Sequence, residues 1–172
     1  MPRIAAVTYI LLLLISLIGS VHANPAANPF NILLEHARKG NADAMFEVGK
    51  HYASGEYTAQ NWRESLYWYQ QAVQKNHARA MLYLGRILLQ GVEEAEVPAD
   101  VPRALQLIEQ AASAGDAEAQ FQLGQIFAQG EVIGQDLPSA IRWYRAANQQ
   151  GYPHAGQAMR RSIELFKNRF AH

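Results

Sequence analysis

Three segments of this chain repeat the same residue types in the same order, and this internal repeat restricts the possible folds more than any other feature. The segments begin at Asn41, Asn76 and Gly115. The matching positions are Ala44, Ala80 and Ala119, then Gly49, Gly85 and Gly124, then Gly55, Gly91 and Gly130. The steps between copies are 36 and then 39 residues. A repeat of this length is one supersecondary unit that buries its apolar face by stacking on its neighbours, so it predicts a solenoid.

A second block of matching residues follows each of these segments. Its positions are Asn61, Asp100 and Asp136, then Ser65, Ala104 and Ala140, then Ala72, Ala111 and Ala147. Here the steps are 39 and then 36 residues, so the three extra residues of the second copy lie between Gly91 and Asp100. Each copy therefore contains two blocks, and the loop that joins them is longest in the second copy.

Both blocks have the pattern of amphipathic helices. In the first block the apolar residues are Ala42, Ala44, Val48 and Tyr52, and the polar residues Asp43, Glu47, Lys50 and Ser54 form a separate stripe. The repeated glycine, Gly49 in the first copy, lies inside this helix, where glycine costs about 1 kcal/mol relative to alanine. Its recurrence predicts that a neighbouring helix packs closely against it.

The second block carries start and stop signals of its own. Its N-cap residues are Asn61, Asp100 and Asp136, and its stops are Asn76, Gly115 and Gly151. Glu64 is placed to complete a capping box with Asn61, and Pro102 and Pro138 fall in the first turn, where proline is tolerated. These signals predict a helix-turn-helix pair in each copy.

The first 23 residues have the three parts of a signal peptide. Arg3 precedes an apolar run from Ile4 to Ile18, and Val21 and Ala23 supply the small side chains of a cleavage site. We therefore expect cleavage after Ala23 and export, most simply to the periplasm. The alternative is an uncleaved anchor, which the run disfavours because a spanning helix needs about 20 apolar residues.

The composition fits a soluble, packed domain of neutral charge. Apolar residues make up 49% of the chain and charged residues 17%, which is outside the range of disordered sequences. The 15 basic and 15 acidic side chains balance, and cleavage leaves 14 against 15, so we expect neither nucleic acid nor an anionic membrane as a partner. There is no cysteine, which excludes disulfides, a thiol nucleophile and thiolate metal sites.

No group of residues indicates catalysis or metal binding. The histidines lack the His-Glu-x-x-His spacing, so surface or packing roles are favoured for His36, His51, His77 and His154. The acidic loop from Glu93 to Asp100 lacks the spacing of a calcium loop. We therefore expect no enzyme activity, no cofactor and no metal.

The third copy closely resembles the Sel1-like repeat, a relative of the tetratricopeptide repeat. The matching residues are Ala117, Ala119, Leu123, Gly124, Phe127, Gly130, Asp136, Ala140, Trp143, Tyr144, Ala147 and Gly151. The first copy keeps Trp68-Tyr69 but has Asn61 and Ser65, and the second has Leu107-Ile108 in place of the aromatic pair. The resemblance covers roughly residues 30 to 165. It implies an all-α fold, a short right-handed α-solenoid in which the Trp-Tyr pairs pack between repeats rather than form a carbohydrate platform.

The ends of the chain depart from the repeat as the ends of a solenoid should. Arg160 and Phe166 stand where the glycines would be in a fourth copy, and the last helix has an apolar stripe of Met159, Ile163, Phe166 and Phe170. We therefore expect a C-terminal capping helix in 152–172. The other divisions are a signal peptide in 1–23, a partial capping helix in 24–40, and repeats in 41–76, 77–115 and 116–151. This organisation predicts eight helices: one half-repeat, three pairs and a cap.

The resemblance also implies a function: a non-catalytic scaffold or adaptor, expected to be a monomer, that binds a protein or peptide partner in the bacterial cell envelope. In related solenoids the first helices line the concave side, which makes their outer polar positions the candidate binding surface. These positions are Asp43, Glu47, Lys50, Arg79, Tyr83, Arg86, Glu118, Gln122 and Gln125. One alternative is a peptidoglycan- or β-lactam-related binding protein or hydrolase, which the absence of cysteine disfavours. Another is a membrane-tethered assembly factor, if the N-terminal segment is retained.

Overall fold

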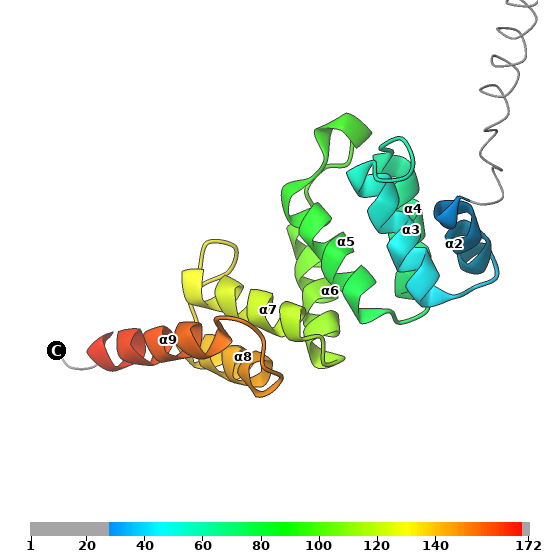
Figure 1. Ribbon diagram of the computed structural model, residues 1–172. Coiled ribbons are helices and arrows are strands. Elements are labelled where there is room, and N and C mark those ends of the chain that lie inside the picture. The colour runs from blue at the N-terminus through cyan, green and yellow to red at the C-terminus, as the bar shows by residue number, and fades with distance from the viewer. Residues whose placement is uncertain (1–27, 170–172) are drawn as a thin grey trace, which may run out of the picture.

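The computed structural model describes residues 28–169, and within them the chain folds into eight α-helices and one short 3-10 helix (Figure 1). The helices are α2 (Pro29–Arg38), α3 (Ala42–Ser54), α4 (Trp62–Gln74), α5 (Ala78–Gln90), α6 (Val101–Ser113), α7 (Ala117–Gln129), α8 (Leu137–Gln149) and α9 (Ala155–Arg169), with the 3-10 helix η2 (Glu93–Ala95) between α5 and α6. The predicted all-α class and helix count are confirmed. The expected signal peptide and Phe170 lie outside the described residues.

The helices pack as sequential pairs. Each of α3, α5 and α7 makes its most extensive contacts with the helix that follows it, and contacts between successive pairs are smaller. Figure 1 shows α3 to α6 side by side with their axes roughly aligned, whereas the axes of α7, α8 and α9 are turned strongly away from them. No helix in residues 28–169 combines the length and the apolar character that crossing a bilayer requires.

The repeated glycines lie where the two helices of a pair touch. A Cβ atom added at Gly49 would be 2.8 Å from the ring of Tyr69, and one at Gly124 would be 2.6 Å from the ring of Tyr144. At Gly85 the nearest atom would be Ile108 Cγ1, also at 2.8 Å. The predicted close approach is confirmed in all three repeats, and its partner is always a side chain of the second helix.

The predicted N-caps of the second helices are also confirmed. The side chains of Asn61, Asp100 and Asp136 accept hydrogen bonds from the amides of Glu64, Arg103 and Ser139, at 3.1 to 3.2 Å. The capping box at Glu64 is wrong, however. The Asn61 amide donates to the Tyr52 carbonyl at 2.8 Å and not to the Glu64 carboxylate. The amides of Asp100 and Asp136 make the equivalent bond to the preceding helix, so this contact fixes the loop in every repeat.

The predicted stops of the second helices coincide with a left-handed turn of the backbone. The φ angle is 59° at Asn76, 94° at Gly115 and 75° at Gly151. Glycine and asparagine adopt this conformation at the lowest cost, which explains why only these residues occur at the three positions.

The longer loop of the second repeat is a small structure in its own right. Val92 and Val97 form an antiparallel bridge through hydrogen bonds of 2.8 and 3.0 Å, and Ala95 between them is buried. Arg63 of α4 reaches Glu96 at 3.3 Å. In the other two repeats a single glutamine, Gln60 or Gln135, ties the shorter loop to a backbone carbonyl of the preceding helix.

The last helix differs from the predicted cap in one respect. Ala155 and Ser162 are its buried residues, whereas Phe166 is 36% exposed and Leu165 is 47% exposed. The predicted apolar stripe of α9 is therefore only partly covered, because Met159 and Ile163 are half-buried and Phe166 is exposed. The cause is length: α9 has 15 residues and α8 has 13, and Figure 1 shows the end of α9 projecting past its partner.

Candidate binding surface

The nine candidate residues come from three equivalent rows on the first helices of the repeats. Asp43, Arg79 and Glu118 are the second residue of α3, α5 and α7. The next row contains Glu47, Tyr83 and Gln122, and the last row contains Lys50, Arg86 and Gln125. All nine are exposed or half-buried. We call these nine residues the ladder.

Grooves run between successive first helices, and ladder residues line each of them. The first groove, of about 750 Å³, lies between the ends of α3 and α5 and is bordered by the long loop of the second repeat. Its lining includes Lys50, Tyr83 and Arg86. The middle groove, of about 440 Å³, separates α5 from α7. The last groove, of about 430 Å³, separates α7 from α9. The face formed by α3, α5, α7 and α9 is therefore hollowed along its length.

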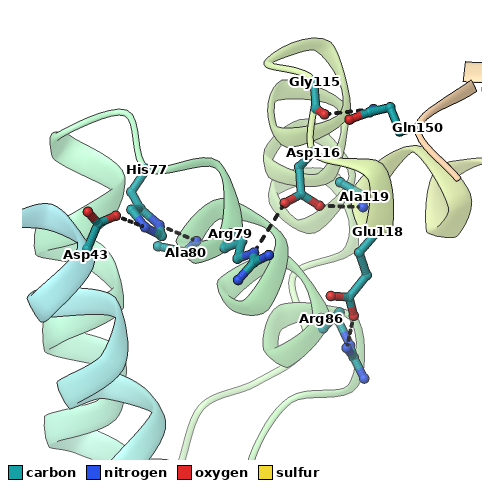
Figure 2. Close-up of polar contacts among 10 residues, drawn as sticks. All are labelled: Asp43, His77, Arg79, Ala80, Arg86, Gly115, Asp116, Glu118, Ala119 and Gln150. Atoms are coloured by element: carbon teal, nitrogen blue, oxygen red, sulfur yellow. Dashed lines mark hydrogen bonds and ion pairs between the residues drawn. The ribbon is translucent and has the colours of Figure 1, made fainter. Parts of the chain in front are cut away.

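The charged ladder residues are paired, and three of the pairs join one repeat to the next (Figure 2). Asp43 Oδ1 lies 3.1 Å from His77 Nε2, and Arg86 Nη1 lies 3.1 Å from Glu118 Oε1. Arg79 Nε is 3.8 Å from Asp116 Oδ2. Within α3, Lys50 binds Glu47 at 2.7 Å. Three of the four contacts pair opposite charges, and three of the four link one repeat to the next.

Two of these pairs involve the residue that caps the next first helix. His77 Nδ1 accepts a hydrogen bond from the Ala80 amide at 3.1 Å, so Nε2 carries the proton and donates it to Asp43. Asp116 accepts from the Ala119 amide at 2.8 Å and faces Arg79. Each junction therefore couples the start of a first helix to the second residue of the first helix in the preceding repeat (Figure 2).

Tyr83, at the centre of the ladder, is a packing residue as well as a groove residue. Its ring is half-buried and meets the ring of Phe46 edge-on, with centroids 5.1 Å apart. The ring of Tyr69 lies 6.0 Å away on the same side, and the Arg86 guanidinium lies over the Tyr83 ring at 5.6 Å. Any change at Tyr83 will therefore affect both the core and the groove.

Sequence reasoning missed the residues of α9 and its loop that line the last groove. They include His154, Gln157, Arg161 and Leu165, which face Gln125 across the groove. They were missed because α9 was interpreted as a cap alone. The structure places it beside α7, where the first helix of a fourth repeat would lie.

The pKa shifts of the described groups have local structural causes. Burial raises the pKa values of the Tyr69 and Tyr144 hydroxyls, so both are neutral at ordinary pH. Hydrogen bonds from the Ser139 hydroxyl and amide to the Asp136 carboxylate lower the pKa of Asp136, which caps α8. Between residues 28 and 169, no three histidine, cysteine or acidic side chains are grouped so that they could hold a metal ion.

The chain is similar to known proteins in both sequence and structure. It is 32% identical over 127 residues to chitin synthase regulatory factor 3 of Schizosaccharomyces pombe, a match that covers 73% of this chain and 14% of that protein. It is 30% identical over 131 residues to the exopolysaccharide production negative regulator of Rhizobium meliloti, covering 70% of this chain and 48% of that protein. The chain thus spans less than half the length of either relative.

Among solved structures, a Sel1 repeat protein from Oxalobacter formigenes superimposes with a TM-score of 0.64 at 29% identity. The match covers 74% of this chain and 94% of that one. A family model described as the Sel1 repeat matches residues 42–77, 78–116 and 117–152. These three matches include all six helices from α3 to α8. The chain therefore belongs to the Sel1 repeat family.

Proposed function

We propose that this protein is a non-catalytic scaffold that binds a protein partner along the face formed by α3, α5, α7 and α9. The observation that carries the proposal is the series of adjoining grooves between these helices. Stacked repeats produce an extended surface of this kind, which suits a partner that contacts several repeats at once. The ladder is the candidate contact surface within it.

The two curated relatives support a regulatory rather than a chemical role. Both are named as regulators, one of chitin synthase and one of exopolysaccharide production. Stacked repeats offer an extended surface through which a regulator can bind another protein. We propose the same mode of action for this chain.

The place of action that we propose is the bacterial cell envelope. The support is the pattern of the first 23 residues, with its basic start, its apolar run and Ala23 at the cleavage position. The mature protein would then act in the periplasm, an oxidising compartment in which a chain without cysteine has no thiol to be oxidised.

Site-specific photo-crosslinking in the producing cells tests the proposed face. A crosslinking amino acid is placed at Glu47 or Gln122 on the grooved face, and at the exposed Gln70 or Gln106 on the second helices as matched controls. We expect covalent adducts of discrete mass from the grooved face only. Adducts from Gln70 and Gln106 alone would place the partner elsewhere, and adducts from no position would contradict a stable partner.

A further inference from the structure

Five glutamines line the middle and last grooves, and none of their carboxamides bonds to another residue in the described part of the chain. This glutamine row consists of Gln90, Gln122, Gln125, Gln129 and Gln157. Other glutamines have structural roles: the side chains of Gln60, Gln120 and Gln135 donate to backbone carbonyls. The two grooves share Phe121, Gln125 and Gln129 of α7, so they adjoin along α7 and the row spans both; we call the two grooves together the hollow.

Among the described residues, one arginine in this hollow is paired with a carboxylate and another is not. In the middle groove, Arg86 is paired with Glu118 at 3.1 Å. In the last groove, the exposed side chain of Arg161 has no carboxylate within 4 Å among residues 28–169. The hollow therefore offers uncharged amides along most of its length and one available cation near its α9 end.

The aromatic rings of the hollow are poorly placed to stack on a sugar. Phe121 packs on Tyr144 and Tyr152, with ring centroids 5.4 and 5.1 Å away, and each of these three rings is buried or half-buried. The exposed apolar side chains are aliphatic: Val132 in the middle groove is 40% exposed, and Leu165 in the last groove is 47% exposed. Exposed aliphatic side chains suit the apolar side chains of a peptide, and among the described residues that line the hollow no phenylalanine, tyrosine or tryptophan ring is exposed for a sugar to stack on.

We infer that the glutamine row binds an extended peptide segment of the partner, with an acidic side chain or terminal carboxylate at Arg161. A carboxamide both donates and accepts, as does each peptide unit, so the row can satisfy the backbone of a ligand regardless of its side chains. Val132 and Leu165 contact apolar side chains of the peptide, and Arg161 supplies the charged contact. This inference rests on the proposed function and adds the class of ligand and its position.

The test uses a phage-displayed library of random 12-residue peptides, selected on the full-length chain. The best peptide is synthesised with a fluorescent label, and its affinity is measured by fluorescence polarisation for Gln122→Ala, Gln125→Ala and Arg161→Ala. The matched controls are Gln106→Ala and Arg103→Ala, exposed positions on α6 outside the grooves. Circular dichroism verifies that each variant remains folded.

We expect selected peptides to be enriched in acidic residues. Loss of one hydrogen bond should weaken binding about three- to tenfold for each glutamine, and loss of the charged contact about tenfold or more for Arg161. The α6 controls should bind as the unsubstituted chain does.

Three results would overturn the inference. One is a peptide whose affinity changes with Lys50→Ala in the first groove but not with the groove glutamines; the proposed scaffold function would then stand and only its site would be wrong. Another is binding of a soluble oligosaccharide from an array, weakened by Gln122→Ala and Gln125→Ala, which would identify the ligand as a glycan. The third is selection of no peptide at all. The crosslinking experiment above separates that outcome from failure of the scaffold proposal, because it also detects partners that bind as folded domains.

Discussion

The contact between α5 and α6 at Gly85 gives the sharpest test of how the repeats pack. A Cβ atom at this position would lie 2.8 Å from Ile108 Cγ1 and 3.0 Å from the carbonyl oxygen of Ala104. Favourable contacts between carbon atoms lie at about 3.5 to 4.0 Å. Because the carbonyl belongs to the backbone of α6, a change of rotamer cannot relieve the second overlap. The two helices must move apart.

The expected loss follows from two opposing terms. Alanine favours a helix interior by about 1 kcal/mol over glycine, whereas overpacking a core costs about 1 to 3 kcal/mol. For Gly85→Ala we therefore expect a net decrease of about 1 kcal/mol in the free energy of unfolding. For Gly85→Leu, whose side chain has no space beside Ile108, we expect about 3 kcal/mol or more. Urea unfolding followed by circular dichroism measures both, with Gly134→Ala as the control because nothing lies within 4 Å of a Cβ atom at Gly134.

A double-mutant cycle assigns the loss to Ile108. Ile108→Ala alone should cost about 2 to 5 kcal/mol, because Ile108 is fully buried. In that background the cost of Gly85→Ala should fall by about 1 kcal/mol, since the nearest atom is gone and only the Ala104 carbonyl remains. The reasoning is refuted if Gly85→Ala is more stable than the unsubstituted chain, or if its cost is the same in both backgrounds.

Three further predictions concern the ends of the chain and the ladder. N-terminal sequencing of the exported protein should begin at Asn24, and recovery of the initiator methionine from a membrane fraction would contradict this. Deleting residues 152–172 uncovers the face of α8 on which α9 packs, so it should lower the unfolding midpoint and increase binding of a hydrophobic dye; an unchanged midpoint would show that α9 is not a cap. Arg86→Ala removes an exposed ion pair and should change the free energy of unfolding by less than about 1 kcal/mol, whereas Tyr83→Ala should cost about 2 kcal/mol or more because its ring packs on Phe46. Equal losses for these two variants in urea unfolding would contradict the roles given to them.

The fold could be predicted from the sequence because each of its determinants is local or periodic. The N-cap at Asp136 and the stop at Asn76 act within a few residues of their positions, and the same signals recur in each repeat. Gly85 lies at a contact between two helices, which is not a local feature. Glycine nevertheless recurs at the equivalent positions Gly49 and Gly124, and this recurrence predicts close packing without identifying the partner. Because the repeat occurs three times, the sequence shows the same structural requirement at three positions.

The capping box at Glu64 shows why a correct motif can still give a wrong contact. The sequence pattern is present, but a capping box needs the Asn61 amide to be unpaired. In the fold that amide bonds to the Tyr52 carbonyl, nine residues earlier in the chain. The competing partner becomes visible only after the two helices are packed.

The ladder illustrates a second limit of sequence reasoning. Periodicity placed Arg86 and Tyr83 on the outer face of α5, and both line the first groove there. The pattern could not show that Glu118, 32 residues away, would pair with Arg86, or that Tyr83 would turn toward Phe46. Such contacts depend on the angle between successive repeats, which is a property of the packed array.

The two junctions between repeats explain how binding and architecture share one surface. Asp43 with His77 and Arg79 with Asp116 use different side chains in the same geometry, a helix cap contacted by the second residue of the preceding first helix. The same positions therefore meet at both junctions, although the side chains differ. Charges engaged in this way already have a partner within the chain, with which a ligand would have to compete. In the grooves that α7 forms with α5 and α9, the glutamine row and Arg161 have no such partner among residues 28–169, so they are the groups that we assign to recognition of a partner.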